Sequence, residues 1–220
     1  MSTDFRKSTV YQIYPKSFCD TNKDGLGDLR GVIKKLDYMK ELGVDYIWLT
    51  PFFVSPQNDN GYDVEDYYNI DPRYGTMEDV EELIAEGKKR GIGLMFDMVF
   101  NHVPTRHEWF RKAMEGDPYY KDFFFFRKGK DDGAPPTNWE SKFGGNAWEY
   151  VEKFDEYYLH LFDVTQADLN WDNENVRREI QKIVRFWMDK GVRGFRFDVV
   201  NLISKGAFED DQTGDGRKYY

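Results

Sequence analysis

An arginine and an aspartate stand two positions apart at the end of an apolar segment, GFRFDVVN, at residues 194–201. In an extended strand, side chains at positions i and i+2 share a face, so we expect Arg196 beside Asp198. A neighbouring guanidinium keeps a carboxylate ionised and able to attack as a nucleophile. An ordinary ion pair at a strand end has the same pattern, so this motif alone does not establish catalysis.

Short β-prone segments alternate with helical segments, and these elements would position the pair. We expect strands at residues 10–14, 46–50, 93–100 and 194–199, and helices at residues 29–42, 77–90 and 175–190. Buried strands separated by helices favour parallel pairing with right-handed crossovers. The predicted fold is α/β, about the first four units of a (β/α)₈ TIM barrel. A doubly wound open sheet is the alternative, but no Gly-rich phosphate loop follows the first strand.

The alternation breaks off between the third and fourth predicted strands. This stretch holds a short helical segment at residues 109–114, an aromatic run and a hairpin-like segment near residues 157–162. We therefore predict three parts: residues 1–102 as the first part of the barrel, residues 103–171 as a small inserted domain, and residues 172–220 as the continuation of the barrel. In such barrels, active sites gather at the carboxyl ends of the strands. The polar and aromatic residues expected there are Asp59, Tyr62, Asp97, His102, Arg196 and Asp198.

Composition limits the class of protein and its partners. The 220 residues are 40% hydrophobic and 32% charged, which supports a core in a soluble chain, and the formal charge of −9 disfavours nucleic acid and anionic membranes. The first ten residues contain no signal-like apolar stretch, and no run approaches the ~18 apolar residues of a membrane span. A single cysteine, Cys19, excludes an intrachain disulfide and favours a cytoplasmic location. The 18% of aromatic residues suit either a bulky core or a sugar-stacking pocket.

One polar loop has the donor spacing of a cation site. Its oxygen donors are the side chains of Asp20, Asn22, Asp24 and Asp28 and the carbonyl of Leu26. Ca²⁺ and Mg²⁺ prefer such oxygen-only sets, although the loop is not an EF-hand, because Gly31 stands where a bidentate Glu is required. A metal-free polar turn is the alternative. No cluster of His and Cys suggests zinc.

Six segments in order resemble the motifs of the α-amylase superfamily, glycoside hydrolase family thirteen, in its intracellular α-glucosidase branch. They are VYQIYPKSF (10–18), DTNKDGLGDLRG (20–31), WLTPFFVSPQNDNGYDVEDY (48–67), DMVFNH (97–102), QADLNWDN (166–173) and GFRFDVVN (194–201). Within that branch, the segments at residues 136–149 and 157–171 are most similar to those of trehalose-6-phosphate hydrolases. Oligo-1,6-glucosidases and dextran glucosidases are close neighbours.

The resemblance implies a role for several residues. Asp198 would be the nucleophile of a retaining α-glucosidase, forming a covalent glucosyl-enzyme, and Arg196 would hold it in position. Asp59 and Tyr62 would grip the terminal glucose, and His102 would donate to one of its hydroxyls. The remaining implied site residues are Asp97, which would organise the site, Phe143, Phe162 and Gln166, which would line the pocket, and Val199, which is typical of enzymes that accept linkages other than α-1,4.

The resemblance also implies what the chain lacks and what it binds. The family's acid/base Glu follows a fifth strand, which the sequence does not contain, so we expect an amino-terminal portion that is catalytically incomplete. The substrate would be a phosphorylated disaccharide, with Lys142 and Arg217 as candidate phosphate ligands. No catalytic cofactor is expected, and the Asp20–Asp28 loop would hold one structural cation. The non-enzyme alternative is a barrel relative acting as a structural subunit, but that class lacks the catalytic residues found here. The sequence gives no indication of oligomeric state.

Overall fold

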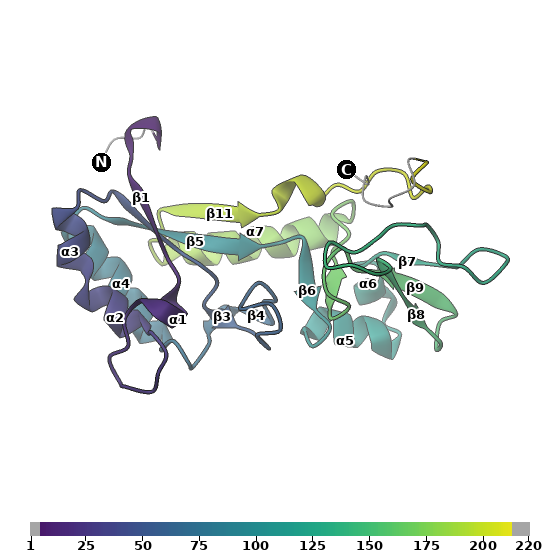
Figure 1. The fold of residues 1–220 in the computed structure, drawn as a ribbon, viewed down its shortest axis with the longest axis horizontal. Helices are drawn as coiled ribbons and strands as arrows, with labels where there is room; N and C mark the ends of the chain where they lie inside the picture. Colours follow the sequence, from purple (N-terminus) through teal and green to yellow (C-terminus); the bar gives the residue numbers. More distant parts are fainter. Residues whose placement is uncertain (1–4, 213–220) are drawn as a thin grey trace. The chain divides into compact units, whose positions relative to one another are not determined.

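Four strands form the main sheet of the computed structural model, which describes residues 5–212 (Figure 1). Its order is β1 (Val10–Ile13), β2 (Tyr46–Leu49), β5 (Gly93–Val99) and β11 (Gly194–Asp198). β1 pairs with β2, and β2 with β5, in parallel; Ile47 lies opposite Leu94. Helices connect these strands, as in the first half of a (β/α)₈ barrel, and the predicted fold class is confirmed.

The connecting helices begin and end close to the predicted positions, with one exception. α4 (Met77–Lys89) begins with a capping box between Thr76 and Asp79, and α7 (Glu174–Asp189) precedes β11. The single helix predicted at residues 29–42 is wrong: the structure has α2 (Leu29–Lys34) and α3 (Leu36–Glu41), separated at Lys35. Buried residues continue with helical spacing on both sides of Lys35, so the hydrophobic pattern does not register the break.

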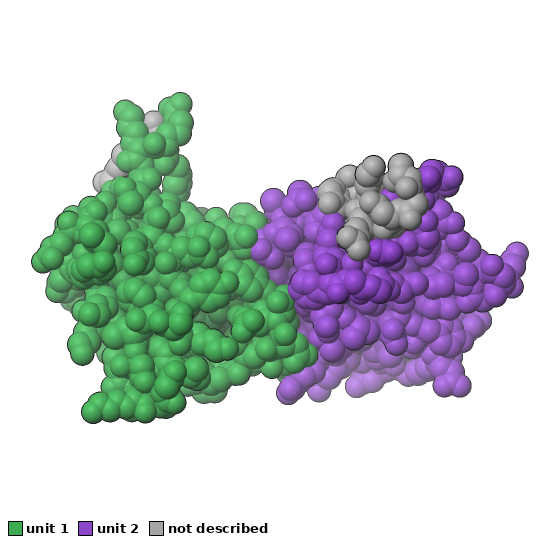
Figure 2. All heavy atoms as spheres, viewed as in Figure 1, with its two compact units in different colours: residues 1–98, 182–197 green, residues 99–181, 198–220 purple. Residues whose placement is uncertain are grey.

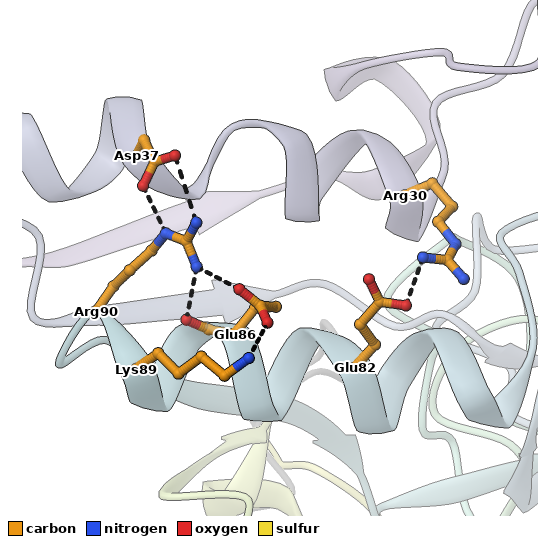
Figure 3. Close-up of polar contacts among 6 residues, drawn as sticks. All are labelled: Arg30, Asp37, Glu82, Glu86, Lys89 and Arg90. Atoms are coloured by element: carbon orange, nitrogen blue, oxygen red, sulfur yellow. Dashed lines mark hydrogen bonds and ion pairs between the residues drawn. The ribbon is translucent and has the colours of Figure 1, made fainter.

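Ion pairs on the surface connect α4 to the two preceding helices (Figure 3). The guanidinium of Arg30 lies 2.5 Å from Glu82, and that of Arg90, directly after α4, lies 2.6 Å from both Asp37 and Glu86. Such exposed pairs add little stability, because water and salt screen the charges. The packing of these helices therefore depends mainly on their buried apolar residues, which include Leu29, Val32, Leu36, Val80 and Leu83.

The chain divides into two compact units, shown in different colours in Figure 2. The first unit comprises residues 1–98 and 182–197, and the second comprises residues 99–181 and 198–220. The first unit also contains a 3₁₀ turn (Phe5–Lys7), α1 (Pro15–Phe18) and an antiparallel pair, β3 (Phe53–Val54) and β4 (Asp66–Ile70). Its core contains an aromatic cluster in which the Trp187 ring centroid lies 5.4 Å from that of Phe53 and 5.2 Å from that of Phe96.

The second unit has two small antiparallel sheets. β6 (His102–Pro104) pairs with β10 (Gln166–Asp168), and β7 (Phe126–Arg127), β9 (Glu156–Leu159) and β8 (Trp148–Val151) form the other, in that order. Its helices are α5 (Glu108–Glu115) and α6 (Pro118–Lys121). The hairpin predicted near residues 157–162 is formed by β8 and β9, and its second strand ends at Leu159. Within residues 5–212, no helix is both long and apolar enough to cross a membrane.

The end of β11 differs from the predicted strand at residues 194–199. The strand ends at Asp198, and Val199 takes a left-handed conformation with φ 37° and ψ 38°. A short 3₁₀ turn, η2 (Val200–Leu202), follows directly. A positive φ is strained for a β-branched side chain. Val199 nevertheless packs against a buried cluster of the second unit, whose members include Leu161 and Leu202.

Candidate active site

A buried aspartate on β5 organises the polar residues of the first unit. Asp97 is fully buried and accepts hydrogen bonds through Oδ2 from Trp48 Nε1 at 2.9 Å and from the Tyr62 hydroxyl at 3.2 Å. Arg196 Nη1 lies 3.0 Å from Asp97 Oδ1 and 3.2 Å from Oδ2. The guanidinium also lies over the Trp48 ring, 5.0 Å from its centroid. Three strands of the sheet and one loop thus supply this group, which we call the Asp97 group.

These contacts fix Arg196 from two directions. The carboxylate of Asp97 neutralises the guanidinium, and the indole face of Trp48 adds a cation–π contact. Sequence spacing pointed to Asp198 as the neighbour of Arg196 on β11. It could not show Asp97, which lies 99 positions away along the chain. Trp48 was missed as well, although it lies in β2, an aromatic-rich strand that pairs with β5.

Tyr62 acts as a neutral donor in the Asp97 group. Burial, together with the nearby negative charge of Asp97, raises the pKa of the Tyr62 phenol well above its ordinary value. The hydroxyl therefore keeps its proton and donates to the carboxylate across the physiological pH range. A tyrosine in this state combines an apolar ring with a hydroxyl whose partner is fixed.

The turn that carries Asp59 and Tyr62 is held by a different aspartate. Asp63 is buried and accepts from Ser55 Oγ at 2.7 Å and from the Asn58 backbone N–H at 2.8 Å. Asp59 itself is partly exposed, and its carbonyl accepts from the Tyr62 N–H at 2.9 Å. Sequence analysis did not single out Asp63, although it follows Tyr62 directly. Its burial could not be inferred from the local sequence.

His102 lies at the start of β6 in the second unit and is almost fully buried. Its Nδ1 is 3.1 Å from Asn101 Nδ2, and its Nε2 is 3.2 Å from Gln166 Nε2 on β10. The His102 and Phe162 ring centroids are 5.0 Å apart, and Phe162 and Phe143 are 5.6 Å apart. The structure therefore brings together four of the predicted residues: His102, Phe143, Phe162 and Gln166. Of these, Phe143 is the most exposed, at 59%.

A fully buried ion pair lies beside His102. Asp168, opposite His102 in the β6–β10 pair, has Oδ2 2.7 Å from Lys205 Nζ and 3.0 Å from Asn101 Nδ2. Its Oδ1 accepts from the Leu161 backbone N–H at 2.8 Å. We call these residues, with His102, the Asp168 group. Sequence analysis missed Asn101, Asp168 and Lys205, and no local pattern connects Lys205 with a carboxylate 37 positions earlier.

Asp198 and Val199 stand at the junction of β11 and the turn η2. Asp198 is the last residue of the strand and lies two positions after Arg196. Asp198 is partly buried. Val199 was expected at a strand end and instead has the left-handed conformation described above, so the chain turns sharply directly after the candidate nucleophile.

The candidate cation loop is closed by its own hydrogen bonds. Asp20 accepts from the backbone N–H groups of Lys23 and Gly25 at 2.6 and 3.0 Å, and Asp24 accepts from that of Leu26 at 2.8 Å. Burial disfavours the charged form of Asp28, but hydrogen bonds from Thr21 and Gly31 outweigh it and lower its pKa.

Hard cations prefer oxygen donors of this kind, and each carboxylate can accept further contacts. The residues that would hold the ion are Asp20, Asn22, Asp24, Asp28 and, through its carbonyl, Leu26. Across residues 5–212, however, no cluster of three or more His, Cys, Asp or Glu side chains is arranged to hold a metal. The cation therefore stays a prediction. Of the candidate phosphate ligands, Lys142 is partly buried, and Arg217 lies outside the described residues.

Parallel strands joined by helices, with charged side chains near their carboxyl ends, are the architecture of a barrel enzyme domain. Comparison with known families defines that class further: the family described as "Alpha amylase, catalytic domain" matches residues 12–220. The chain therefore belongs to the α-amylase catalytic-domain family, and the resemblance inferred from the six motifs is confirmed.

Individual relatives give a finer comparison. The chain is 56% identical over 218 residues to trehalose-6-phosphate hydrolase of Bacillus subtilis (strain 168), covering 98% of this chain and 39% of that protein. It is 52% identical over 221 residues to oligo-1,6-glucosidase of Heyndrickxia coagulans, covering 100% of this chain and 40% of that protein. The chain thus spans about two fifths of the length of the curated relatives it matches.

Solved structures agree with this picture. The crystal structure of Bacillus licheniformis trehalose-6-phosphate hydrolase matches with a TM-score of 0.96 and 58% identity, over 98% of this chain and 39% of that one. Isomaltulose synthase from Erwinia rhapontici NX5 matches with a TM-score of 0.92 and 49% identity, over 97% of this chain and 38% of that one. The same fold thus occurs in proteins named for different sugar reactions.

Proposed function

We propose that the chain forms the part of a retaining α-glucoside hydrolase that supplies the nucleophile and contacts the terminal glucose. The observation that carries this proposal is the placement of Arg196, two positions before Asp198 on β11 and held by both Asp97 and Trp48. A guanidinium fixed in this way provides a stationary positive charge for a neighbouring carboxylate. Fixed charges of this kind stabilise a nucleophile without reorganisation during the reaction.

In the proposed reaction, the Asp198 carboxylate attacks the anomeric carbon and the bond to the leaving-group oxygen breaks, giving a covalent glucosyl-enzyme. Water then hydrolyses this intermediate with overall retention. A second carboxyl group, about 5–5.5 Å from the nucleophile, must protonate the leaving oxygen. We assign that acid/base role to no residue of this chain, and we expect no turnover by the chain alone.

The other predicted residues would bind the sugar. Tyr62 offers a neutral ring for stacking, Asp59 a carboxylate for a hydroxyl, and His102 a ring nitrogen for a second hydroxyl. Phe143, Phe162 and Gln166 would shape the pocket, and Val199 would favour linkages other than α-1,4. Asp97 would act through Arg196 and Tyr62, both of which its carboxylate contacts.

We further propose trehalose 6-phosphate as the substrate, cleaved to glucose and glucose 6-phosphate. Relatives with this name are 56% identical to the chain in two bacteria, compared with 52% for an oligo-1,6-glucosidase. Because that margin is small, isomaltose-type oligosaccharides are the competing substrates. A phosphorylated disaccharide is a cytoplasmic metabolite, which accords with the single, free Cys19 and with the proposed cytoplasmic location.

The test joins residues 1–220 to the part of the Bacillus subtilis relative that the match leaves uncovered. The fusion should hydrolyse trehalose 6-phosphate faster than trehalose or isomaltose, and the first glucose released should be the α-anomer in NMR spectra. Asp198→Asn should lower kcat on the order of 10⁴-fold or more, since the nucleophile is lost. Asp189→Asn, at an exposed aspartate of α7, is the matched control.

Three outcomes would contradict the proposal. Release of the β-anomer would exclude retention, and full activity of Asp198→Asn would exclude this nucleophile. Preference for isomaltose would leave the α-glucosidase assignment in place and replace the substrate. Loss of activity in Asp189→Asn as well would show that the fusion is intolerant of substitution. The Asp198→Asn comparison would then be repeated in a fusion to the oligo-1,6-glucosidase of Heyndrickxia coagulans.

A further inference from the structure

Lys205, in the second unit, has a side chain that is only 1% exposed. Burying an ammonium group is costly unless each of its three N–H donors finds an acceptor. Lys205 meets this requirement: Nζ lies 2.7 Å from Asp168 Oδ2 and 2.8 Å from Asn101 Oδ1, and it also donates to the carbonyl of Leu202. The three acceptors come from three separate stretches of the chain.

Two of these acceptors border His102. Asn101 uses its oxygen for Lys205, so its amide nitrogen is directed to Asp168 Oδ2 at 3.0 Å and lies 3.1 Å from His102 Nδ1. Asp168 is the cross-strand neighbour of His102 in the β6–β10 pair. The lysine therefore determines which end of the Asn101 amide faces the imidazole, and it anchors the strand opposite His102.

The third acceptor lies in the turn that follows the candidate nucleophile. Leu202 ends η2, and its backbone N–H donates to the Val199 carbonyl at 2.8 Å. Val199 has a strained backbone conformation, which persists only where the surroundings hold it. Lys205 donates to the carbonyl of Leu202, the last residue of this turn, and so holds the backbone that follows Asp198.

We propose that Lys205 is a positioning residue that sets both the His102 imidazole and the backbone that follows Asp198. The proposal deepens the proposed function, since it takes His102 and Asp198 to act on the sugar. Lys205 touches neither the sugar nor the reacting atoms. A merely structural lysine would change stability alone, whereas a positioning lysine also changes the environment of the His102 ring and the rate of the chemical step.

The first measurement uses the 220-residue chain itself. The sequence has three histidines, at positions 102, 107 and 160, and single His→Gln variants assign their ring signals in ¹H–¹⁵N NMR spectra. Lys205→Met should shift the His102 ring signals and leave those of His107 in place, and Lys205→Arg should restore them in part. Lys121→Met is the matched control, because Lys121 also forms an ion pair in the second unit, 2.5 Å from Glu156.

The second measurement uses the fusion described above. Lys205→Met should lower kcat about 10²-fold, as expected for a small misplacement of reacting groups, with KM much less affected. Lys205→Arg should recover part of that loss, and Lys121→Met should match the parent. If the parent fusion is inactive, the proposed function fails, and the NMR measurement alone decides the role of Lys205.

Unchanged His102 signals in a folded Lys205→Met chain would overturn the proposal, as would a pure KM effect in the fusion. If Lys205→Met does not fold, the double variant Lys205→Met/Asp168→Asn removes both charges and should show the same His102 shift. If the double variant also fails to fold, the unsubstituted chain decides. Its Lys205 ammonium should give a slowly exchanging ¹H–¹⁵N signal with a nuclear Overhauser contact to the Asn101 amide, and absence of that contact would overturn the proposal.

Discussion

The Asp97 group and the Asp168 group each pair a fully buried aspartate with a cation, but the two cations differ. Arg196 is 34% exposed and spreads its charge over a planar guanidinium that also contacts Trp48. Lys205 is 1% exposed, and its three N–H groups donate to acceptors of the protein. The first pair thus keeps part of its cation available to solvent or a ligand, whereas the second pair is closed.

This difference separates two ways of using a buried carboxylate. The Asp97 carboxylate accepts from the neutral donors of Trp48 and Tyr62 as well as from Arg196, so it keeps some hydrogen bonds if one of these partners is lost. Asp168 compensates a charge that water cannot reach. The Asp97 group is therefore suited to holding an arginine whose exposed part can contact a ligand. The Asp168 group is suited to fixing backbone and side-chain positions.

The largest expected effect is on stability, when each aspartate is removed in turn. Asp168→Ala leaves Lys205 buried without its countercharge and should lower the free energy of unfolding by about 3–5 kcal/mol. Asp97→Ala leaves a cation that water can reach and should cost about 1–3 kcal/mol. Urea denaturation gives both values, and hydrogen exchange shows in which unit protection is lost. Equal losses in both variants would contradict the distinction between the two groups.

The elements of the fold were more predictable from sequence than the contacts of the site. Strands β1, β2 and β5 end within one residue of the predicted positions, because short β-prone apolar runs there are bounded by residues such as Pro51 and Gly91. The break at Lys35 was not predictable, since Leu36 and Met39 continue the apolar spacing. Val199 was misplaced because local propensity favours a strand, whereas in the fold it has a left-handed conformation and packs against the buried cluster that includes Leu202.

The same distinction between local pattern and long-range contact applies to the candidate site. The expectation that Arg196 lies beside Asp198 needed only the two-residue spacing along a strand, and it stays a prediction. The Arg196–Asp97 and Lys205–Asp168 contacts join residues far apart in sequence, and only the folded chain brings them together. The resemblance to known motifs supplied Asp59, Tyr62, His102 and Gln166, but not their positioning neighbours Trp48, Asp63 and Lys205.

A smaller effect is expected from the turn that places Tyr62 in the Asp97 group. Gly61 has φ 98°, and a Cβ at this position would come within 2.9 Å of the Pro51 carbonyl oxygen. Gly61→Ala should therefore cost about 1–3 kcal/mol and move the Tyr62 hydroxyl away from Asp97. Gly133→Ala is the matched control, because Gly133 has φ 81° but open space around a Cβ. Denaturation and the tyrosine ring signals in NMR spectra measure the two effects.

If Gly61→Ala and Gly133→Ala lose the same stability, then strain at positive φ accounts for the whole effect and the close approach to Pro51 contributes nothing. If the Tyr62 signals stay unchanged in a destabilised Gly61→Ala chain, the turn does not position Tyr62. Either result would weaken the view that the Asp97 group depends on several neutral donors held by separate elements.

The smallest expected effect is the pH dependence of the loop that supports Gln166, next to the Asp168 group. Asp163 accepts from the hydroxyl and the backbone N–H of Thr165, at 2.6 and 2.9 Å, and its own N–H donates to Gln166 Oε1 at 2.9 Å. The Thr165 hydroxyl, followed by its backbone N–H, lowers the pKa of the Asp163 carboxyl. A lowered pKa means that the folded state binds the proton more weakly than the unfolded state does.

The resulting stabilisation is present in full above the ordinary aspartate pKa of 3.8 and disappears as pH falls through the lowered folded value. Thr165→Val removes the hydroxyl, so its stability deficit relative to the parent chain should be constant at neutral pH and shrink below about pH 4. Denaturation midpoints measured from pH 7 to pH 3 test this, with Thr21→Val, whose hydroxyl binds Asp28 in the first unit, as the comparison. A Thr165→Val deficit that grows on acidification would reverse the sign of the linkage and show that the hydroxyl stabilises the protonated form of Asp163.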